Sequence, residues 1–216
     1  MIRSFTPNEV LYLIGAARWT IALSLVAFIG GSGLGLIVML CRVSGSRALL
    51  TLSTVYIEFF QCTPLLSQLL VMYFGFGLFR VDVNPWVAAS CALILNSSAF
   101  LGEIWRGCIQ SIPRAQWEAG SSLCLNFLQQ VRYIILPQAI RIAIPPTVGF
   151  SVQVIKSTSL ASVIGVVELT RGAQILNAAT FRPFLVYFVV GVIYFAICYP
   201  LTSLSRRLES RIDVPR

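Results

Sequence analysis

The sequence predicts an all-α, polytopic membrane protein with five transmembrane helices. Hydrophobic residues make up 57% of the 216 residues, charged residues make up only 11%, and the mean hydropathy is +0.83. A soluble domain of this size could not hide so much apolar surface from water. The apolar residues also occur in runs long enough to cross a bilayer as helices, which takes about 20 residues.

Each predicted span rests on one of these runs. Four runs carry no charged residue: 19–41, 59–79, 83–102 and 183–205. A fifth run, 142–160, is interrupted only by Lys156 and contains Pro145 and Pro146 near its start. We therefore expect one transmembrane domain, 1–216, with a long loop at about 107–137 and spans at about 17–41, 52–79, 85–106, 139–160 and 183–205.

The arginines are divided unequally between the two sides that five spans would create. Ten of them fall on the side of the C-terminus and five on the side of the N-terminus. Because Lys and Arg accumulate on the cytoplasmic side, we expect an outside N-terminus, an inside C-terminus and a cytoplasmic loop at 107–137. The same bias accounts for the net charge of +8, so we expect the lipid bilayer as a partner and no nucleic acid.

The composition argues against an enzyme. The chain contains no histidine, which removes the commonest acid–base catalyst and transition-metal ligand. Its six cysteines form no CxxC pair and are expected to be packing residues. Lys156 and Ser157 are not preceded by the glycine-rich turn of a phosphate-binding loop. We therefore expect no catalytic residue, no metal site and no bound cofactor, and any ATP must be used by a separate subunit.

The first span carries Gly31 and Gly35, which have the spacing of a GxxxG motif. Small residues at this spacing allow two helices to approach closely. The motif predicts a helix contact, which can lie within the chain or at a subunit interface.

The second span carries a polar stripe. Glu58, Gln61 and Gln68 are spaced three and seven apart, so a continuous helix would place them on one face. Thr63 and Pro64 lie between them, and proline bends a helix because it removes a backbone donor. Polar groups in hydrocarbon face either a cavity or a neighbouring helix. This stripe therefore predicts either a pathway lining or a hydrogen bond between helices.

The third and fourth spans repeat the pattern. Asn96 and Glu103 share a face, with Ser98 beside them, although Glu103 could instead pair with Arg106 one turn later. Gln153 and Lys156 share a face of the fourth span, and Lys156 is the only lysine of the chain. An ammonium group inside a membrane is costly, so Lys156 is predicted to have a functional role. The alternative is a structural ion pair with Glu58, Glu103 or Glu168. The candidate pathway residues are Glu58, Gln61, Gln68, Asn96, Ser98, Glu103, Gln153 and Lys156.

The loop between the third and fourth spans contains an amphipathic segment, 114–127, in which small residues surround Glu118. Small side chains let another protein approach a helix closely, and a carboxylate can hold a partner charge. The segment therefore predicts a docking surface, with an interfacial connector as the alternative. The candidate docking residues are Arg114, Gln116, Glu118, Ala119, Gly120, Ser121, Leu123 and Cys124.

Four segments, in order along the chain, carry a family resemblance: 58–69, 96–113, 118–137 and 156–169. The third combines Glu118, Ala119 and Gly120 with the Ile-Ile-Leu-Pro run at 134–137. Together they resemble the integral membrane permeases of bacterial ATP-binding cassette importers for polar amino acids. The resemblance covers about 11–209.

This resemblance implies a permease subunit that carries a polar or charged amino acid across the bacterial inner membrane. It implies cytoplasmic ATP-binding subunits, a second permease subunit, identical or paralogous, and an external amino-acid-binding protein. ATP-driven closure of the ATP-binding subunits would push on the third and fourth spans through the coupling helix around Glu118. If the polar faces converge, Glu103 is the candidate partner of the substrate ammonium, and Lys156 is either the carboxylate partner or a structural tie.

The chain departs from the family pattern at several positions. Gln61 and Cys62 replace an Arg-Gly pair, Gly120 replaces an alanine, Cys124 replaces the glycine of the loop, and Ser157 replaces an aspartate. The alternative functions are a secondary transporter or channel with a Lys156 and Glu103 relay, and a membrane scaffold. The polar faces on three spans disfavour the scaffold, and no internal repeat supports the carrier.

Overall fold

The computed structural model describes residues 6–78 and 82–212, and these residues form helices and connecting turns without a β-strand. The elements are α1 (Pro7–Val43), α2 (Arg47–Cys62), α3 (Leu65–Leu78), α4 (Pro85–Gln110), α5 (Arg114–Ser122), α6 (Phe127–Gln130), the π-helix η1 (Val131–Ile135), α7 (Leu136–Ser157), the 3₁₀ helix η2 (Thr158–Ile164), α8 (Leu169–Thr180) and α9 (Pro183–Ile212). The all-α prediction is confirmed.

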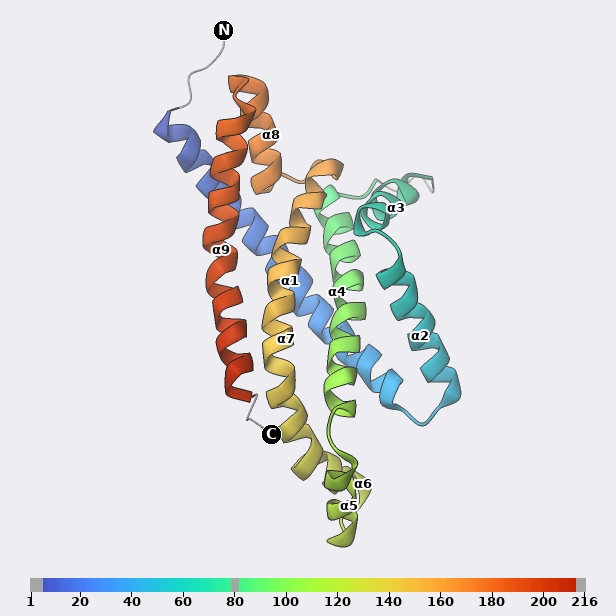
Figure 1. The fold of residues 1–216 in the computed structure, drawn as a ribbon. Helices are drawn as coiled ribbons and strands as arrows, with labels where there is room; N and C mark the ends of the chain where they lie inside the picture. Colours follow the sequence, from blue (N-terminus) through green and yellow to red (C-terminus); the bar gives the residue numbers. More distant parts are fainter. Residues whose placement is uncertain (1–5, 79–81, 213–216) are drawn as a thin grey trace.

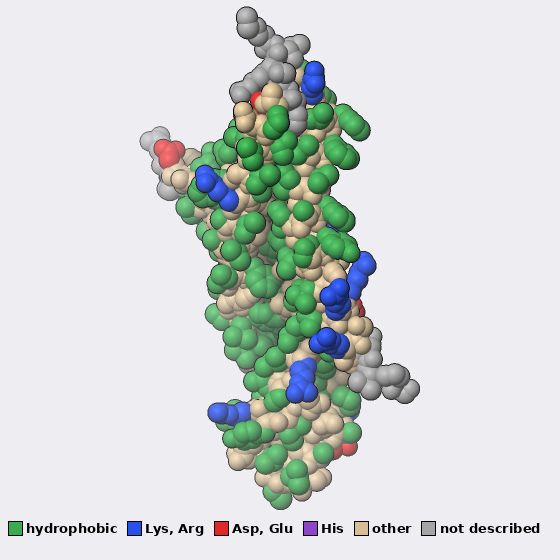
Figure 2. Space-filling view, turned by 90° about the vertical axis from the view of Figure 1, so that its left-hand side faces the viewer, with side chains coloured by type: hydrophobic (Ala, Val, Ile, Leu, Met, Phe, Trp, Pro, Cys, Tyr) green, Lys and Arg blue, Asp and Glu red, His purple; other side chains and the backbone are tan. Residues whose placement is uncertain are grey.

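The long helices form one elongated bundle. In Figure 1, α4, α7 and α9 run along the molecule and α1 crosses them diagonally, while α5 and α6 lie at one end and α8 at the other. Four helical stretches are long and apolar enough to cross a membrane, and α2 with α3 makes a fifth if the pair is one broken span. Figure 2 shows hydrophobic side chains over the middle and Lys and Arg gathered toward the α5–α6 end.

The second predicted span, 52–79, is not one helix. It breaks after Cys62, and α2 and α3 meet at an angle of 102°. Pro64 has no N–H to continue the helix, and a residue before proline is driven to extended backbone, as Thr63 is with ψ 141°. Gln68 therefore lies on a different helix from Glu58 and Gln61, and the prediction of one shared face is wrong.

Glycines allow α1 to lie almost in backbone contact with α4. A Cβ at Gly31 would lie 2.6 Å from the Ser97 Cβ, and one at Gly35 would lie 3.1 Å from the Ser98 carbonyl oxygen. Gly102 faces them from α4, where a Cβ would lie 3.0 Å from the Gly35 oxygen. The GxxxG motif therefore makes a contact within the chain. The main apolar core extends from this contact and includes Leu23, Ala27, Leu69, Ala89, Leu93 and Val154.

A buried carboxyl group fixes the connector between α7 and α9. Glu168 is fully buried and caps α8, because its carboxyl oxygens accept from the backbone N–H groups of Thr170 and Arg171 at 2.9 and 2.8 Å. The hydroxyl groups of Thr20 on α1 and Tyr194 on α9 also donate to it, at 3.3 and 3.1 Å. Glu168 therefore ties α8 to two long helices, and it has no ion pair with Lys156 among the described residues.

Candidate functional site

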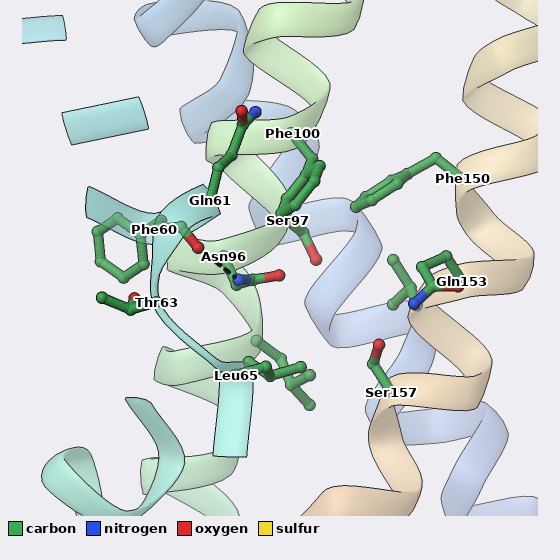
Figure 3. Close-up of a pocket in the computed structure, with 12 residues that line it drawn as sticks. Phe60, Gln61, Thr63, Leu65, Asn96, Ser97, Phe100, Phe150, Gln153 and Ser157 are labelled. Atoms are coloured by element: carbon green, nitrogen blue, oxygen red, sulfur yellow. Dashed lines mark hydrogen bonds between the residues drawn. The ribbon is translucent and has the colours of Figure 1, made fainter. Parts of the chain in front are cut away.

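A cavity of about 290 Å³ lies where the broken helix meets α4 and α7 (Figure 3). The break between α2 and α3 supplies one wall, α4 a second and α7 a third. The lining residues are Phe60, Gln61, Thr63, Leu65, Leu93, Asn96, Ser97, Phe100, Phe150, Gln153, Val154 and Ser157.

Two amide side chains satisfy the backbone groups that the break leaves unpaired. Gln68 Nε2 donates to the Phe60 oxygen at 2.9 Å and to the carbonyl and hydroxyl oxygens of Thr63 at 3.1 and 2.8 Å. Asn96 Nδ2 donates to the Phe60 oxygen at 3.3 Å and to Gln68 Oε1 at 3.1 Å. Because buried carbonyls are costly when unpaired, these contacts hold the break in place. The side-chain oxygen of Asn96 points away from Phe60 and toward α7 (Figure 3).

Two aromatic rings form the wall of the cavity nearest α5. Phe100 follows Asn96 by one turn of α4, which runs toward α5, and Phe150 precedes Gln153 on α7, which runs away from α6. The rings stack with centroids 5.5 Å apart and an interplanar angle of 19°. The stacked rings of Phe100 and Phe150 therefore line the side of the cavity nearest α5, while Asn96, Gln153 and Ser157 line it farther along α4 and α7 (Figure 3).

The cavity carries no charged side chain in the described part of the chain. Its polar groups are amides and hydroxyls, which both donate and accept hydrogen bonds. Such a lining can orient a small polar molecule but offers no acid, base or nucleophile of adjusted pKa. The arrangement fits binding and passage better than catalysis.

The structure brings only some of the predicted pathway residues together. Gln61, Asn96 and Gln153 line the cavity, and Gln68 lies directly behind Asn96. The other four do not line it. Glu58 is exposed on α2, and the Ser98 hydroxyl is buried against the Tyr56 hydroxyl at 2.6 Å.

Glu103 is placed away from the cavity, contrary to the prediction that it faces the substrate. Its carboxylate forms a bidentate ion pair with Arg106 on the next turn of α4 and lies 3.6 Å from Nε of Arg42 on α1. Arg42 also donates to Thr54 on α2 at 2.5 Å. Arg42 on α1 therefore contacts both Thr54 on α2 and Glu103 on α4, and these contacts join the three helices.

Lys156 also lies outside the cavity. Although it follows Gln153 by three residues, it is turned toward α9 and lines a separate hollow with Tyr194, Cys198 and Arg206. Within residues 6–78 and 82–212, no carboxylate lies within 4 Å of its ammonium group. The predicted pairs with Glu58, Glu103 or Glu168 are thus absent from this part of the chain.

Several cavity residues were not predicted from the sequence. Phe100 and Ser157 each lie four residues after a predicted one, Asn96 and Gln153, so helical periodicity could have found them. Phe150 has no such signal, because an aromatic residue in an apolar run is indistinguishable from a lipid-facing one.

The predicted docking residues form a short exposed helix and the turn after it. Arg114, Gln116, Glu118, Ala119, Ser121, Leu123 and Cys124 are exposed. Gly120 is the exception, since it packs on Gln130 and Ile134, and a Cβ there would lie 3.0 Å from both side chains. The small residue at 120 thus seats α5 on the segment that leads into α7.

Cys124 adopts the left-handed backbone conformation that glycine favours, with φ 55°. Leu125 N–H donates to the Gly120 oxygen at 3.2 Å and Cys124 N–H to the Ser121 oxygen at 2.9 Å, which is the Schellman ending of a helix. Cys124 therefore makes the helix-ending turn that the family pattern makes with a glycine.

A π-helical turn joins this loop to α7. Pro137 has no N–H for the Tyr133 carbonyl, and its ring would clash with that carbonyl in a regular helix. The chain avoids the clash by widening to a π-helix over Val131–Ile135. Trp117 of α5 stacks on Phe127 with centroids 6.0 Å apart, so α5, α6 and the start of α7 form one packed unit.

The chain is similar to known transport proteins over nearly its whole length. It is 39% identical to the L-cystine transport system permease protein TcyB of Bacillus subtilis, with 98% of this chain and 89% of that protein covered. It is 36% identical to the glutamine transport system permease protein GlnP of Escherichia coli K12, with 94% and 93% covered. A solved structure titled as an amino acid ABC transporter with histidines matches with a TM-score of 0.91 at 32% identity, covering 98% of this chain and 100% of that one.

The model of one protein family matches residues 31–214, which include the broken helix, all three walls of the cavity and the predicted docking loop. The fold of the MetNI methionine transporter also matches, with a TM-score of 0.77 at 17% identity. The chain belongs to the family of inner membrane components of binding-protein-dependent transport systems.

Proposed function

We propose that this chain is the permease subunit of an ATP-driven importer for an uncharged polar amino acid. Two relatives that are 39% and 36% identical to this chain are named as permeases for L-cystine and glutamine. The observation that supports the proposal most directly is the cavity between the α2–α3 break, α4 and α7, which is polar and yet uncharged in the described residues.

The cavity favours a neutral side chain on the substrate for an electrostatic reason. A free amino acid carries one positive and one negative charge, which amide and hydroxyl groups can solvate by donating and accepting hydrogen bonds. A third charge on the substrate would need a partner of opposite sign, since an unpaired charge in a low-dielectric site is costly. Neither Glu103 nor Lys156 supplies that partner in the cavity, because both side chains point elsewhere.

We place the docking loop in the cytoplasm and α8 outside, as the arginine distribution favours. The exposed face of α5, with Glu118 at its centre, would contact the ATP-binding subunit. Movement of α5 would reach the cavity through α4 and α7, which flank the loop and carry the stacked Phe100 and Phe150. A second permease subunit would close the open side of the cavity, and an external binding protein would deliver the substrate.

The relay of Lys156 and Glu103 that a secondary transporter would need is not favoured. Glu103 is engaged by two arginines, while Lys156 lines a different hollow between α7 and α9. An ion relay requires groups close enough to exchange a proton or a bound ion.

Uptake by the complete importer tests the substrate class. Uptake of radiolabelled glutamine, arginine and glutamate is compared. Uptake of glutamine, the neutral amino acid, should be at least tenfold more efficient than uptake of the other two. Gln153→Leu should raise the concentration for half-maximal uptake by about tenfold, the effect of one lost hydrogen bond to a charged group. Glu58→Gln, a change outside the cavity, should leave it unaltered. Equal uptake of arginine and glutamine would contradict the proposed substrate class.

Charge reversal tests the docking surface. Glu118→Lys should leave the permease in the membrane but abolish uptake, because repulsion and desolvation both act at a closely packed contact. Glu209→Lys reverses an exposed charge on α9 and serves as the control. Unchanged uptake and unchanged co-purification of the ATP-binding subunit in Glu118→Lys would exclude this contact.

A further inference from the structure

A second hollow lies on the other side of the α4–α7 pair from the cavity. This groove has a volume of about 520 Å³ and is walled by α1, α4 and α7, whereas the cavity is walled by α4, α7 and the α2–α3 break. Its lining is apolar apart from Thr147 and the ring nitrogen of Trp105. Trp105 Nε1 donates to Thr147 Oγ1 at 2.9 Å, and Thr147 Oγ1 donates to the Ala143 oxygen at 2.6 Å. The polar atoms of the groove thus satisfy one another, and it suits an apolar occupant.

The groove is formed by candidate membrane-spanning helices. Its three walls belong to helical stretches that are long and apolar enough to span a bilayer. Several lining side chains are substantially exposed, among them Leu36 (48%), Leu136 (41%) and Ile140 (52%). We expect an exposed apolar groove between such helices to be filled by lipid hydrocarbon, since water has no polar groups to bind there.

Arg132 lies about one helical turn beyond the end of the groove nearest α5. It precedes the lining residue Leu136 by four residues, and the intervening segment Val131–Ile135 is π-helical, so four residues cover slightly less than one turn. Arg132 is exposed and lies over the ring of Tyr133, 5.8 Å from the ring centroid. No carboxylate of residues 6–78 or 82–212 lies within 4 Å of it.

We propose that the groove and Arg132 together bind an anionic phospholipid. An acyl chain would lie along Leu136, Ile140 and Ile144, and the phosphate would accept hydrogen bonds from the Arg132 guanidinium, which suits phosphate geometry. The net negative charge of the headgroup complements an arginine that has no acidic partner in the described structure. The lipid would then contact both helices that connect the docking loop to the cavity.

This site rests on the membrane location of the family and not on the identity of the transported amino acid. Lipids in the leaflet on the docking-loop side have their headgroups at the level of Arg132, because the apolar part of the groove begins one turn farther along α7. Basic residues at such a boundary attract anionic lipids, each contributing roughly a fivefold preference.

Native mass spectrometry of the assembled importer tests the site. The complex, purified with its ATP-binding subunits, is exposed to equal amounts of phosphatidylglycerol and phosphatidylcholine, and the retained lipids are counted. The native chain should retain phosphatidylglycerol preferentially. Arg132→Gln should lower that preference about fivefold, whereas Arg182→Gln, an exposed arginine at the other end of the molecule, should not change it.

Variants that fill the groove test whether lipid retention depends on the groove or only on the charge of Arg132. Ala143→Leu narrows the groove, and Leu36→Trp does so from α1 at a half-exposed position that accepts a larger ring. Both variants should reduce retention of phosphatidylglycerol, whereas Ala179→Leu, at an exposed position of α8, should not. If Arg132→Gln lowers retention while both filled variants retain lipid normally, the groove is not the site. If Arg132→Gln releases the ATP-binding subunit with lipid retention unchanged, Arg132 is a docking residue and the proposal is overturned.

Discussion

Asn96 on α4 donates a hydrogen bond to Gln68 on α3 at 3.1 Å, and both amide groups donate to the same carbonyl oxygen, that of Phe60. Phe60 lies near the end of α2, so this pair of amides connects three helices at one backbone atom. The pair fixes the 102° break that opens one wall of the cavity. Stability of the break and shape of the cavity therefore depend on the same side chains.

Loss of the Gln68 amide should destabilise the protein. Gln68→Leu keeps the side-chain size but removes the donor to the Thr63 carbonyl and the acceptor for Asn96, and it leaves the Phe60 carbonyl with the Asn96 hydrogen bond alone. The expected loss is about 1–3 kcal/mol in the free energy of unfolding. Thermal unfolding of the purified protein in detergent measures it.

Gln61→Leu is the matched control for that experiment. Gln61 also lines the break, but it is exposed in the chain, and its side chain makes none of the hydrogen bonds that hold the break. Its unfolding temperature should stay near that of the native chain while uptake changes. An equal loss of stability in both variants would mean that Gln68 has no special role at the break.

Glu103→Gln should act on stability and not on substrate affinity. The carboxylate joins α1 and α4 through Arg42 and Arg106, and it is partly exposed, so the loss should be at most about 1 kcal/mol. Membrane abundance should fall slightly, and the concentration for half-maximal uptake should remain constant for every transported amino acid. A rise in that concentration at normal abundance would instead restore Glu103 to the substrate pathway.

A pair of glycine variants tests the contact between α1 and α4. Gly31→Ala would place a Cβ 2.6 Å from the Ser97 Cβ, so one helix must shift, at a cost of about 1–3 kcal/mol. Gly33→Ala meets nothing within 4 Å and should be neutral or slightly stabilising, because alanine favours helix. The difference between their unfolding temperatures is the measurement, and identical temperatures would contradict the close approach.

Glu168 should make stability depend on pH. Burial raises the pKa of this carboxyl group above its ordinary value of 4.5, and the hydrogen bonds from Thr170 and Arg171 only partly oppose that effect. The folded state therefore holds the proton more tightly than the unfolded state. Its contribution is full below pH 4.5 and is lost as pH rises through the raised pKa. The unfolding temperature of the native chain should therefore fall as pH rises through the raised pKa. In Glu168→Gln this fall should be absent, and a fall that persists would mean that another group causes it.

The sequence was sufficient where one rule applied over a whole segment. Charge-free runs of about 20 residues identified α1, α4 and α9, and a run interrupted only by Lys156 identified α7, because a bilayer sets that length. The amphipathic, small-residue segment likewise identified the helix that contains Glu118. The orientation remains a prediction from the arginines.

The sequence was insufficient where the chain changes direction or where a partner comes from another helix. Proline at 64 predicted a bend, but helical periodicity cannot be carried across a break, so Gln68 was assigned to the wrong face. Arg106 was a visible alternative partner of Glu103, whereas Arg42 is distant in sequence and reaches it only in the folded bundle. Lys156 was assigned to the wrong side of α7. Ser157, the next residue, lines the cavity, whereas Lys156 faces α9.

Cys124→Gly should stabilise the docking loop, and this prediction separates backbone strain from side-chain function. A left-handed conformation costs about 1–2 kcal/mol for a residue other than glycine, while glycine returns about 0.5–1 kcal/mol through the entropy of the unfolded chain. The net gain should be up to about 1 kcal/mol in the free energy of unfolding, with uptake preserved. Cys124→Val should lose stability, because a β-branched side chain tolerates this conformation poorly. Cys62→Gly should also lose about 1 kcal/mol, since Cys62 ends a regular helix. If Cys124→Gly abolishes uptake in a stable protein, the thiol itself contributes to docking and strain is not its main consequence.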